Sequence, residues 1–574
     1  MALVSDMRAP TSERTAAWDL PHSELVLSLL WASFLTLLIA GPWLLPGYLF
    51  GTDWPGPRHF GLSNSIGSSV PLEAAMAGLG WAVGGELAGK LLILGSLFAA
   101  AFLAYRAVPA GGAVPRAAAA TVYVVNPFVY GRLHYGQIFL LVAYAILPWT
   151  LTRLRGMLMD PSRRSSIGVA IAFVLVGIAS PHIVLIMGLL AAVLFAAYTV
   201  TQTEKRRYLK TSGPWIAVAI AVAAIASSYW VVPLIAGRGY ESEVLATTGS
   251  GQLNAYAVVS DRSLGLLPNL LGLYGFWAEA TGRFTSMKEF APFWPLVLVA
   301  ILALVAVGIA TALRQSDRHL APLVGGLLVA AAIAVVLEMG ISHPVTAGVV
   351  RWLDANFVVY RGLRDAGKWA ALLALVYSQL FGIGVATLLG LIPTHMNART
   401  SRDLAIGVAT GLLLAMPLYY GNGLLFGAHG EIKPSQYPAG WYAADRLLAS
   451  DAHPGRALML PWHEYMSYGF IQNQNKIVAP PAPTFFSVPV LVSSDPEVQG
   501  ISPPGDTDQV AISRLVAAGD KGQWVQVLTA HGIKYLLLTH DLEWRSYAYL
   551  DFQAGLVKIA DFGSIEVYRN SLSP

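Results

Sequence analysis

The sequence predicts a polytopic α-helical membrane protein of about eleven transmembrane helices, followed by a C-terminal extracytoplasmic α/β domain. Three observations predict this fold class. First, 55% of the 574 residues are hydrophobic and only 12% are charged, whereas soluble domains carry about 25% charged residues. Second, long apolar runs recur through residues 25–427, and a bilayer core needs about 20 apolar residues per helix. Third, these runs stop after residue 427, where the charge rises.

The composition also excludes several classes of protein. The net charge of +4 is small and spread over many loops, which argues against a nucleic-acid partner. The chain has no cysteine, so disulfides, thiolate metal sites and thiol nucleophiles are excluded. No P-loop, GxSxG, HExxH or dinucleotide fingerprint occurs in a suitable context. Nucleotide-driven chemistry is therefore unsupported.

Eleven apolar stretches meet or approach the length of a membrane span. They are Leu25–Leu45, Lys90–Val108, Ala117–Tyr130, Ile138–Leu154, Ile167–Ala179, Ile183–Val200, Trp215–Ala236, Trp294–Leu313, Leu320–Met339, Trp369–Ile392 and Leu404–Phe426. The third and fifth are short and end at Asn126-Pro127 and at Ser180-Pro181-His182. Because proline interrupts helices, we expect these two spans to be broken or tilted.

Lysine and arginine give the orientation. If residues 1–24 are cytoplasmic and the spans alternate, every inside segment is short and carries at least two positive charges, as the positive-inside rule requires. This predicts a multi-pass protein of the plasma (cytoplasmic) membrane, with a transmembrane domain at 25–427 and an extracytoplasmic domain at 428–574. The long outer loops are then 50–89, 237–292 and 340–367.

Periodicity predicts the elements outside the membrane. In the first outer loop, Val70–Leu87 is amphipathic and is expected to form a helix on the membrane surface. The C-terminal region is expected to contain helices at Trp441–Ala449 and Val510–Ala530, buried strands at Ala457–Leu460 and Lys534–Thr539, and a hairpin of Leu556–Asp561 with Ser564–Arg569.

Acidic residues of the first outer loop are the first candidates for chemistry. Asp53 follows the first span in a turn of aromatics and prolines. A carboxylate at this boundary acts as a general base or holds a divalent cation such as Mg²⁺, Mn²⁺ or Ca²⁺. The alternative is a turn Asp that bonds its own backbone. Glu73, after Pro71, suits the first turn of a helix and is a weaker candidate for substrate contact.

Basic residues on the outer side point to a phosphate. Arg361, Arg364 and Lys368 precede the tenth span, against the usual charge bias, and a helix would put Arg364 and Lys368 on one face. Such a pair suits a lipid phosphate, unless Asp365 neutralises it. Arg132, at the rim between two spans, either binds phosphate or extends to lipid headgroups.

A further group of aromatic and polar residues is expected near the outer face. Aromatic rings there either anchor the protein at the interface or line a sugar or prenyl pocket. The loop Trp462-His463-Glu464-Tyr465 follows a predicted strand and is a candidate carbohydrate-contacting loop. The candidate substrate contacts are His134, Tyr135, Gln137, Tyr274, Trp277, Trp462 and His463.

Four sequence features together resemble the GT-C class of polytopic membrane glycosyltransferases. These are the first outer loop with Asp53, NPFVYGRLHYGQ…LPW at 126–149, LLGLYGFW at 270–277 and GLRDAGKW at 362–369. The layout is similar too, with an exterior domain containing HGIKYLLLTHD at 531–541. Within the class, the chain looks most similar to the transmembrane part of actinobacterial arabinofuranosyltransferases and to YfhO-type proteins.

The resemblance implies a glycosyltransferase that uses a polyprenyl-phosphate-linked sugar at the outer membrane face. It implies Asp53 as base or metal contact, and Arg364, Lys368, Arg132 and Arg361 as donor-phosphate ligands. The acceptor would be an envelope glycan, a lipid or a protein, and membrane lipids would surround the spans. One departure is that Asp53 has no acidic neighbour in its loop before Glu73. Two alternatives stay open: a transporter or flippase of lipid-linked glycans, and a non-catalytic glycan-binding scaffold.

Overall fold

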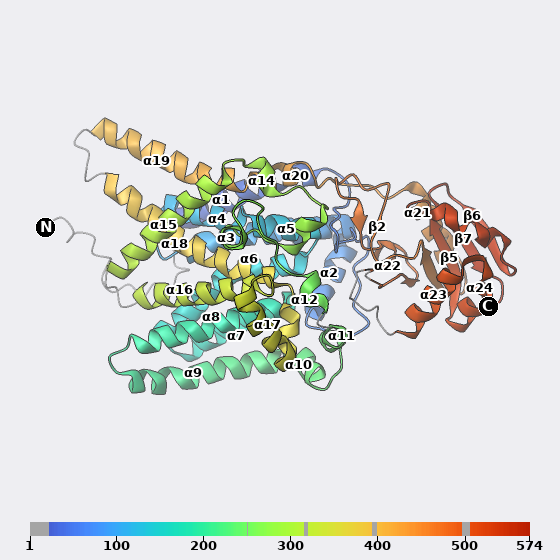
Figure 1. The fold of residues 1–574 in the computed structure, drawn as a ribbon, viewed down its shortest axis with the longest axis horizontal. Helices are drawn as coiled ribbons and strands as arrows, with labels where there is room; N and C mark the ends of the chain where they lie inside the picture. Colours follow the sequence, from blue (N-terminus) through green and yellow to red (C-terminus); the bar gives the residue numbers. More distant parts are fainter. Residues whose placement is uncertain are drawn as a thin grey trace.

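Long helices run side by side along the long axis of the molecule, and a small sheet domain lies beyond one end of them (Figure 1). This computed structural model describes residues 22–248, 251–314, 320–392, 399–495, 497 and 506–573. Most of the predicted cytoplasmic segment 1–24 lies outside the described residues. The helices share one continuous apolar core, which the sheet domain extends with two cores of its own.

Nine helices of the described chain are long and apolar enough to cross a membrane. Each overlaps a predicted span. They are α1 (His22–Ala40, continued by η1, Gly41–Leu44), α3 (Gly85–Ala107), α6 (Ile138–Met159), α8 (Pro181–Val200), α9 (Lys205–Ala226), α15 (Trp294–Arg314), α16 (Leu320–Met339), α18 (Ala370–Leu391, preceded by η4, Ala366–Trp369) and α19 (Arg399–Tyr420).

The two remaining predicted spans hold shorter helices, so the count of eleven is not confirmed. The third becomes α4 (Ala113–Val124) and α5 (Pro127–Tyr135), separated at Asn126. The fifth becomes α7 (Arg163–Ala179), a helix of 17 residues. Proline explains why α4 and α7 end where they do. Pro127 and Pro181 each begin the next helix, and each favours an extended conformation of the residue before it.

Other predicted helices have different ends. The seventh predicted span, Trp215–Ala236, is wrong in its bounds, since α9 ends at Ala226 and α10 (Ser228–Ile235) follows. In the first outer loop α2 (Val70–Val83) stops before Leu87. Gly84 has φ +83° there, a left-handed conformation that only glycine adopts readily.

The long outer loops are built from short helices on the side of the sheet domain. The second loop contains α11 (Tyr240–Thr247), α12 (Gly251–Ala255), α13 (Leu266–Leu271), η2 (Trp277–Thr281) and α14 (Met287–Phe290). The third contains α17 (Pro344–Asn356) and η3 (Val358–Leu363). After α19, the chain passes through η6 (Asn422–Leu424) and α20 (Leu425–His429) into the C-terminal part.

The C-terminal domain is a mixed sheet with both faces covered. Five strands pair in the order β4-β1-β5-β7-β6, where β4 (Val490–Leu491), β1 (Arg456–Leu460) and β5 (Ile533–Thr539) are parallel. The hairpin of β6 (Leu556–Asp561) and β7 (Ile565–Asn570) is antiparallel and adds to β5. Alternate residues of β1 and β5 enter opposite cores, because successive side chains of a strand point to opposite faces.

Helices and short strands complete this domain. Its helices are α21 (Ala439–Ala449), α22 (Ala482–Phe485), α23 (Thr507–Ala518), η7 (Gly519–Lys521), α24 (Trp524–Ala530) and η8 (Trp544–Phe552), and a separate pair is β2 (Met466–Ser467) with β3 (Ile477–Val478). The stretch Val510–Ala530, predicted to be helical, is divided among α23, η7 and α24. It breaks at Gly519, whose φ is +57°, while the predicted strands at Ala457–Leu460 and Lys534–Thr539 are confirmed.

Several residues of the first outer loop pack against the C-terminal domain. Phe50 belongs to that domain's core, with Tyr437 and Trp441. The Tyr437 hydroxyl lies 2.9 Å from the carbonyl of Pro55 and 2.8 Å from that of Gly56. Arg58 forms an ion pair of 2.6 Å with Asp445. The loop that carries Asp53 is thus fixed by contacts far along the chain.

The absence of cysteine makes the predicted topology directly testable. Thr203→Cys lies in the connection between α8 and α9, and Ser546→Cys lies in η8, and both positions are exposed. In intact cells a membrane-impermeant maleimide is expected to label Ser546→Cys, and to label Thr203→Cys only after permeabilisation, because the predicted topology puts these positions on opposite sides of the membrane. Labelling is read on a gel. Equal labelling of both in intact cells would contradict the orientation.

Candidate active site

The block at 126–137 folds into a capped helix that supports the first outer loop. Asn126 caps α5 by accepting from the backbone N–H of Val129 at 3.1 Å, and Pro127 follows as a preorganised first residue. Gly136 ends α5 with φ +76°. A Cβ on Gly136 would lie 2.6 Å from the backbone nitrogen of Trp54. Glycine is needed here because the first loop crosses directly over the end of α5.

Asp53 lies at this crossing. Its backbone N–H donates to the carbonyl of Tyr135 at 2.7 Å. Its carboxylate accepts from the Tyr465 hydroxyl at 2.9 Å and from Gln137. Burial raises the pKa of Asp53 to about 6, although these hydrogen bonds and the charges of Arg283 and Arg132 lower it. The Asp53 side chain is exposed, but its exposed surface faces a cavity that is lined by other parts of the protein.

The cavity joins Asp53 to the basic residues before α18. Its volume is about 610 Å³. Asp53, Arg364 and Lys368 all line it, together with Glu73 and Gln137. Apolar side chains from α6, α8 and α10 form much of the remaining wall; they include Ile138, Phe139, Leu140, Val184, Leu185, Trp230 and Leu234. An acid and two cations, distant in sequence, therefore face one shared space.

Arg364 and Lys368 do not share a helix face, so that prediction is wrong in its geometry. Arg364 ends η3, and Lys368 lies in the separate turn η4. Asp365 between them has ψ of 91°, an extended conformation that interrupts the helix. Lys368 is buried and donates to the carbonyl of Gly362 at 3.3 Å, while Arg364 is half-buried and donates to Thr248 at 3.3 Å. Both cations reach the cavity from consecutive turns.

Arg132 and Asp365 form a buried ion pair. The guanidinium of Arg132 lies 2.5 Å from the carboxylate of Asp365 and 2.8 Å from the side-chain oxygen of Gln137. The ring of Phe276 packs 4.2 Å from the guanidinium carbon. Asp365 therefore neutralises Arg132 from another part of the chain, and Arg132 does not line the cavity.

The other predicted residues lie at different places. Gln137 and Glu73 line the cavity, and Glu73 also accepts from Ser63 and Ser69. Tyr135 contacts Asp53 through its carbonyl. Six predicted residues do not line the cavity: Arg361, His134, Tyr274, Trp277, Trp462 and His463. In the helical part, the Nε of Arg361 donates to the Asp354 carbonyl at 3.3 Å, His134 lies 3.4 Å from Glu431, Lys288 lies over the ring of Tyr274, and Trp277 packs against Tyr135. In the C-terminal domain, Trp462 donates to Ser513 and His463 lies between Glu497 and Glu543.

Two residues near the site were not among the predicted ones. His182, the second residue of α8, lines the cavity next to Gly362. The break at Ser180-Pro181-His182 was the available signal, since it places His182 at a helix end. Arg283 donates to the Tyr135 hydroxyl at 3.1 Å and packs over Tyr465. Its sequence surroundings give no signal, because its role depends on where the second outer loop folds.

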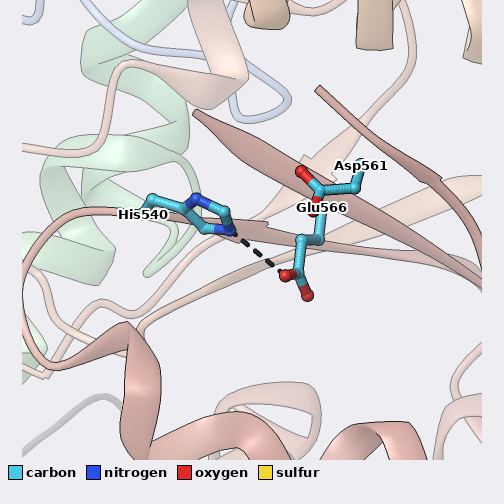
Figure 2. Close-up of side chains that lie close together, drawn as sticks. All are labelled: His540, Asp561 and Glu566. Carbon is cyan, nitrogen blue, oxygen red and sulfur yellow. Dashed lines mark hydrogen bonds and ion pairs between the residues drawn. The ribbon is translucent and has the colours of Figure 1, made fainter. Parts of the chain in front are cut away.

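The residues around Asp53 do not fit a metal site as they stand. In the described part of the chain, the one group of three His, Asp or Glu side chains spaced for a metal is His540, Asp561 and Glu566 in the C-terminal sheet, drawn in Figure 2. Glu566 also accepts from Tyr568 and pairs with Lys558, so its charge is already balanced. Asp53 has Arg283 and Arg132 in its field, which disfavours a cation there.

Comparison with known proteins finds a structural relative. The cryo-EM structure of arabinofuranosyltransferase AftD from Mycobacteria matches 98% of this chain with a TM-score of 0.58 at 17% sequence identity, and a mutant of it matches 96% with a TM-score of 0.57. The fold is GT-C-like. This chain spans 41% of the AftD chain. ArnT from Cupriavidus metallidurans matches 96% of this chain and 94% of its own at 14% identity, but its TM-score is 0.40.

The likeness concerns the fold, since no family model and no curated protein matches the sequence. Within this GT-C-like fold, the cavity brings together a carboxylate whose pKa is raised to about 6 and two basic side chains of the kind that suit an anion. This arrangement allows proton removal at one side and stabilisation of a departing anion at the other.

Breaking the Arg132–Asp365 pair is expected to destabilise the fold. Arg132→Met leaves the Asp365 carboxylate buried without its partner, at a cost of about 3 to 5 kcal/mol, whereas the double variant Arg132→Met/Asp365→Leu removes both charges and recovers most of the loss. Thermal unfolding in detergent measures this, with Arg361→Met as the control of matched chemistry. A single variant as stable as the wild type would contradict the structural role of Arg132.

Proposed function

We propose that this protein is a membrane glycosyltransferase that moves a sugar from a polyprenyl-phosphate donor to an acceptor on the outer face of the membrane. The acceptor is an envelope glycan, a lipid or a protein. The observation that carries the proposal is the single cavity lined by Asp53, Arg364 and Lys368. The GT-C-like fold supports it, and the name of AftD supports an arabinofuranose as the first sugar to test.

The cavity suits both ends of such a donor. The apolar wall from α6, α8 and α10 offers a surface for the first isoprene units. Arg364 and Lys368 offer charge-assisted hydrogen bonds to a phosphate. His182 lies beside them at the start of α8, where the helix dipole also favours an anion. The donor would therefore bind with its tail toward the helices and its sugar toward Asp53.

The reaction follows from this placement. The carboxylate of Asp53 takes the proton of an acceptor hydroxyl, whose oxygen attacks the anomeric carbon of the donor. The new C–O bond forms as the bond between the anomeric carbon and the phosphate oxygen breaks. The electron pair leaves with the phosphate, and Arg364 and Lys368 stabilise its growing negative charge. No step in this sequence passes through a metal ion.

Asp53→Asn is expected to abolish transfer while the protein still folds. Loss of the base lowers the rate by about 10²- to 10⁴-fold, because the amide cannot accept the proton. The assay follows transfer of labelled sugar from undecaprenyl-phosphoryl arabinofuranose, and then from other sugars on the same lipid, in membranes. Asp520→Asn, an exposed Asp of η7, is the control. Wild-type transfer by Asp53→Asn would remove this residue from catalysis.

Arg364→Gln and Lys368→Gln are expected to weaken phosphate binding. Each loses one charge-assisted hydrogen bond, which lowers affinity for undecaprenyl phosphate by about 10-fold or more. Microscale thermophoresis in detergent at pH 7.5 measures the affinity. Arg361→Gln is the matched control, because Arg361 lies in the same segment but does not line the cavity. Equal losses in all three variants would point to nonspecific charge, contradicting the proposed site.

A further inference from the structure

The loop after β1 carries side chains of the C-terminal domain to Asp53. This loop, residues 461–465, is fixed by its own domain. The backbone N–H of Trp462 donates to the Tyr547 hydroxyl at 3.2 Å, and its indole donates to Ser513 at 3.0 Å. The two ring nitrogens of His463 lie 2.8 Å from Glu497 and 3.1 Å from Glu543. The end of the loop is therefore held in place.

Tyr465, at the end of this loop, contacts Asp53, and Glu464 precedes it in the chain. The Tyr465 hydroxyl donates to Oδ1 of Asp53 at 2.9 Å, and Arg283 packs 5.6 Å over the Tyr465 ring. Glu464 is half-buried, it lies in the field of the Asp53 carboxylate, and its Oε2 has no hydrogen-bond partner among the described residues. The acid that Asp53 lacks in its own loop thus comes from a distant domain.

We propose that the C-terminal domain completes the catalytic site, with Tyr465 as the positioning residue of Asp53 and Glu464 as the second carboxyl group of the site. This inference rests on the proposed function, because it concerns the base of that reaction. Tyr465 donates to Oδ1 of Asp53 and so fixes the orientation of the carboxylate. The hydroxyl also stabilises the carboxylate over the neutral acid.

The carboxyl groups of Glu464 and Asp53 differ in how they titrate. Burial and the nearby carboxylates of Asp53, Asp495 and Glu497 raise the pKa of Glu464 to about 7, above the value of about 6 for Asp53. As two coupled acids they lose their protons in two steps. Both groups therefore titrate near neutral pH, and the hydrogen bond that Tyr465 donates to Oδ1 stabilises the ionised form of Asp53, which marks Asp53 as the base of the pair.

Other charged and titratable groups also face this pair, from several elements. Arg132 of α5 and Arg283 of the second outer loop act on Asp53, and Lys368 of η4 feels its charge. The tyrosines whose pKa the charge of Asp53 raises are Tyr135, Tyr240, Tyr256 and Tyr465. The test therefore needs variants that isolate Asp53 from this background.

The test uses pH-dependent binding of a singly charged phosphodiester, methyl undecaprenyl phosphate, to purified full-length protein in detergent. Between pH 5 and pH 8.5 the charge of the phosphodiester is constant. An ionised Asp53 in the same cavity repels it, so affinity falls by about 10-fold as pH rises through the pKa of Asp53. Asp53→Asn is expected to lose this step and to bind more tightly at high pH.

Tyr465→Phe isolates the hydrogen bond. Without the donated hydroxyl the carboxylate is less stable, so the pKa of Asp53 rises and the step moves up by about one pH unit. Tyr549→Phe, in the same domain but with no bond to Asp53, keeps the wild-type midpoint. In the wild type, ionisation of Glu464 is expected to add a second fall in affinity near pH 7. Glu464→Gln loses this second step and keeps the first, whereas the exposed control Glu289→Gln keeps both.

The outcomes separate this inference from the proposed function. If the phosphodiester binds but Tyr465→Phe keeps the wild-type midpoint, Tyr465 does not position Asp53 and the inference is overturned alone. A second step that persists in Glu464→Gln overturns the role of Glu464. If the wild type binds no phosphodiester at any pH, the proposed phosphate site falls, and the inference falls with it. Thermal unfolding confirms that each variant is folded.

Discussion

The buried ion pair of Arg132 and Asp365 is the constraint on which the site depends. Arg132 lies on α5, whose last carbonyl, that of Tyr135, holds the backbone of Asp53. Asp365 lies between Arg364 and Lys368. One contact of 2.5 Å thus ties the segment that carries the acid to the segment that carries the cations. In an apolar interior neither charge is tolerable alone, so the two segments must fold against each other.

The first outer loop is shared between the helical part and the C-terminal domain. Its Phe50 fills the core of that domain, and its Gly51 crosses the end of α5 so closely that a Cβ there would lie 2.6 Å from Gly136. The backbone N–H of Ala479 also donates to the carbonyl of Thr52 at 2.8 Å. Asp53 is therefore placed by two bodies of the fold at once, and its carboxylate geometry depends on both.

Charge explains why the cavity suits an anionic lipid more than a metal ion. The carboxylates of Asp53 and Asp365 are outnumbered by the basic side chains of Arg132, Arg283, Arg364 and Lys368 around the site. A site with this balance gains from one added negative charge, as on a phosphodiester, and gives a divalent cation little attraction. Burial raises the pKa of Asp53 toward neutral pH, whereas the pKa of a carboxyl group in water lies far below neutral pH.

The sequence by itself determined the approximate positions of the nine long apolar helices of the described chain, because hydropathy over about 20 residues is a local property. It also determined which residues were candidates: an acid after the first span and cations before the tenth. Only the tertiary structure decided that Arg132 pairs with Asp365, that the extended residue Asp365 separates the turns of Arg364 and Lys368, and that Tyr465 reaches Asp53. Tyr465 and Asp53 are 412 positions apart. No local pattern encodes such a contact, since it arises only when the cores of both domains have packed.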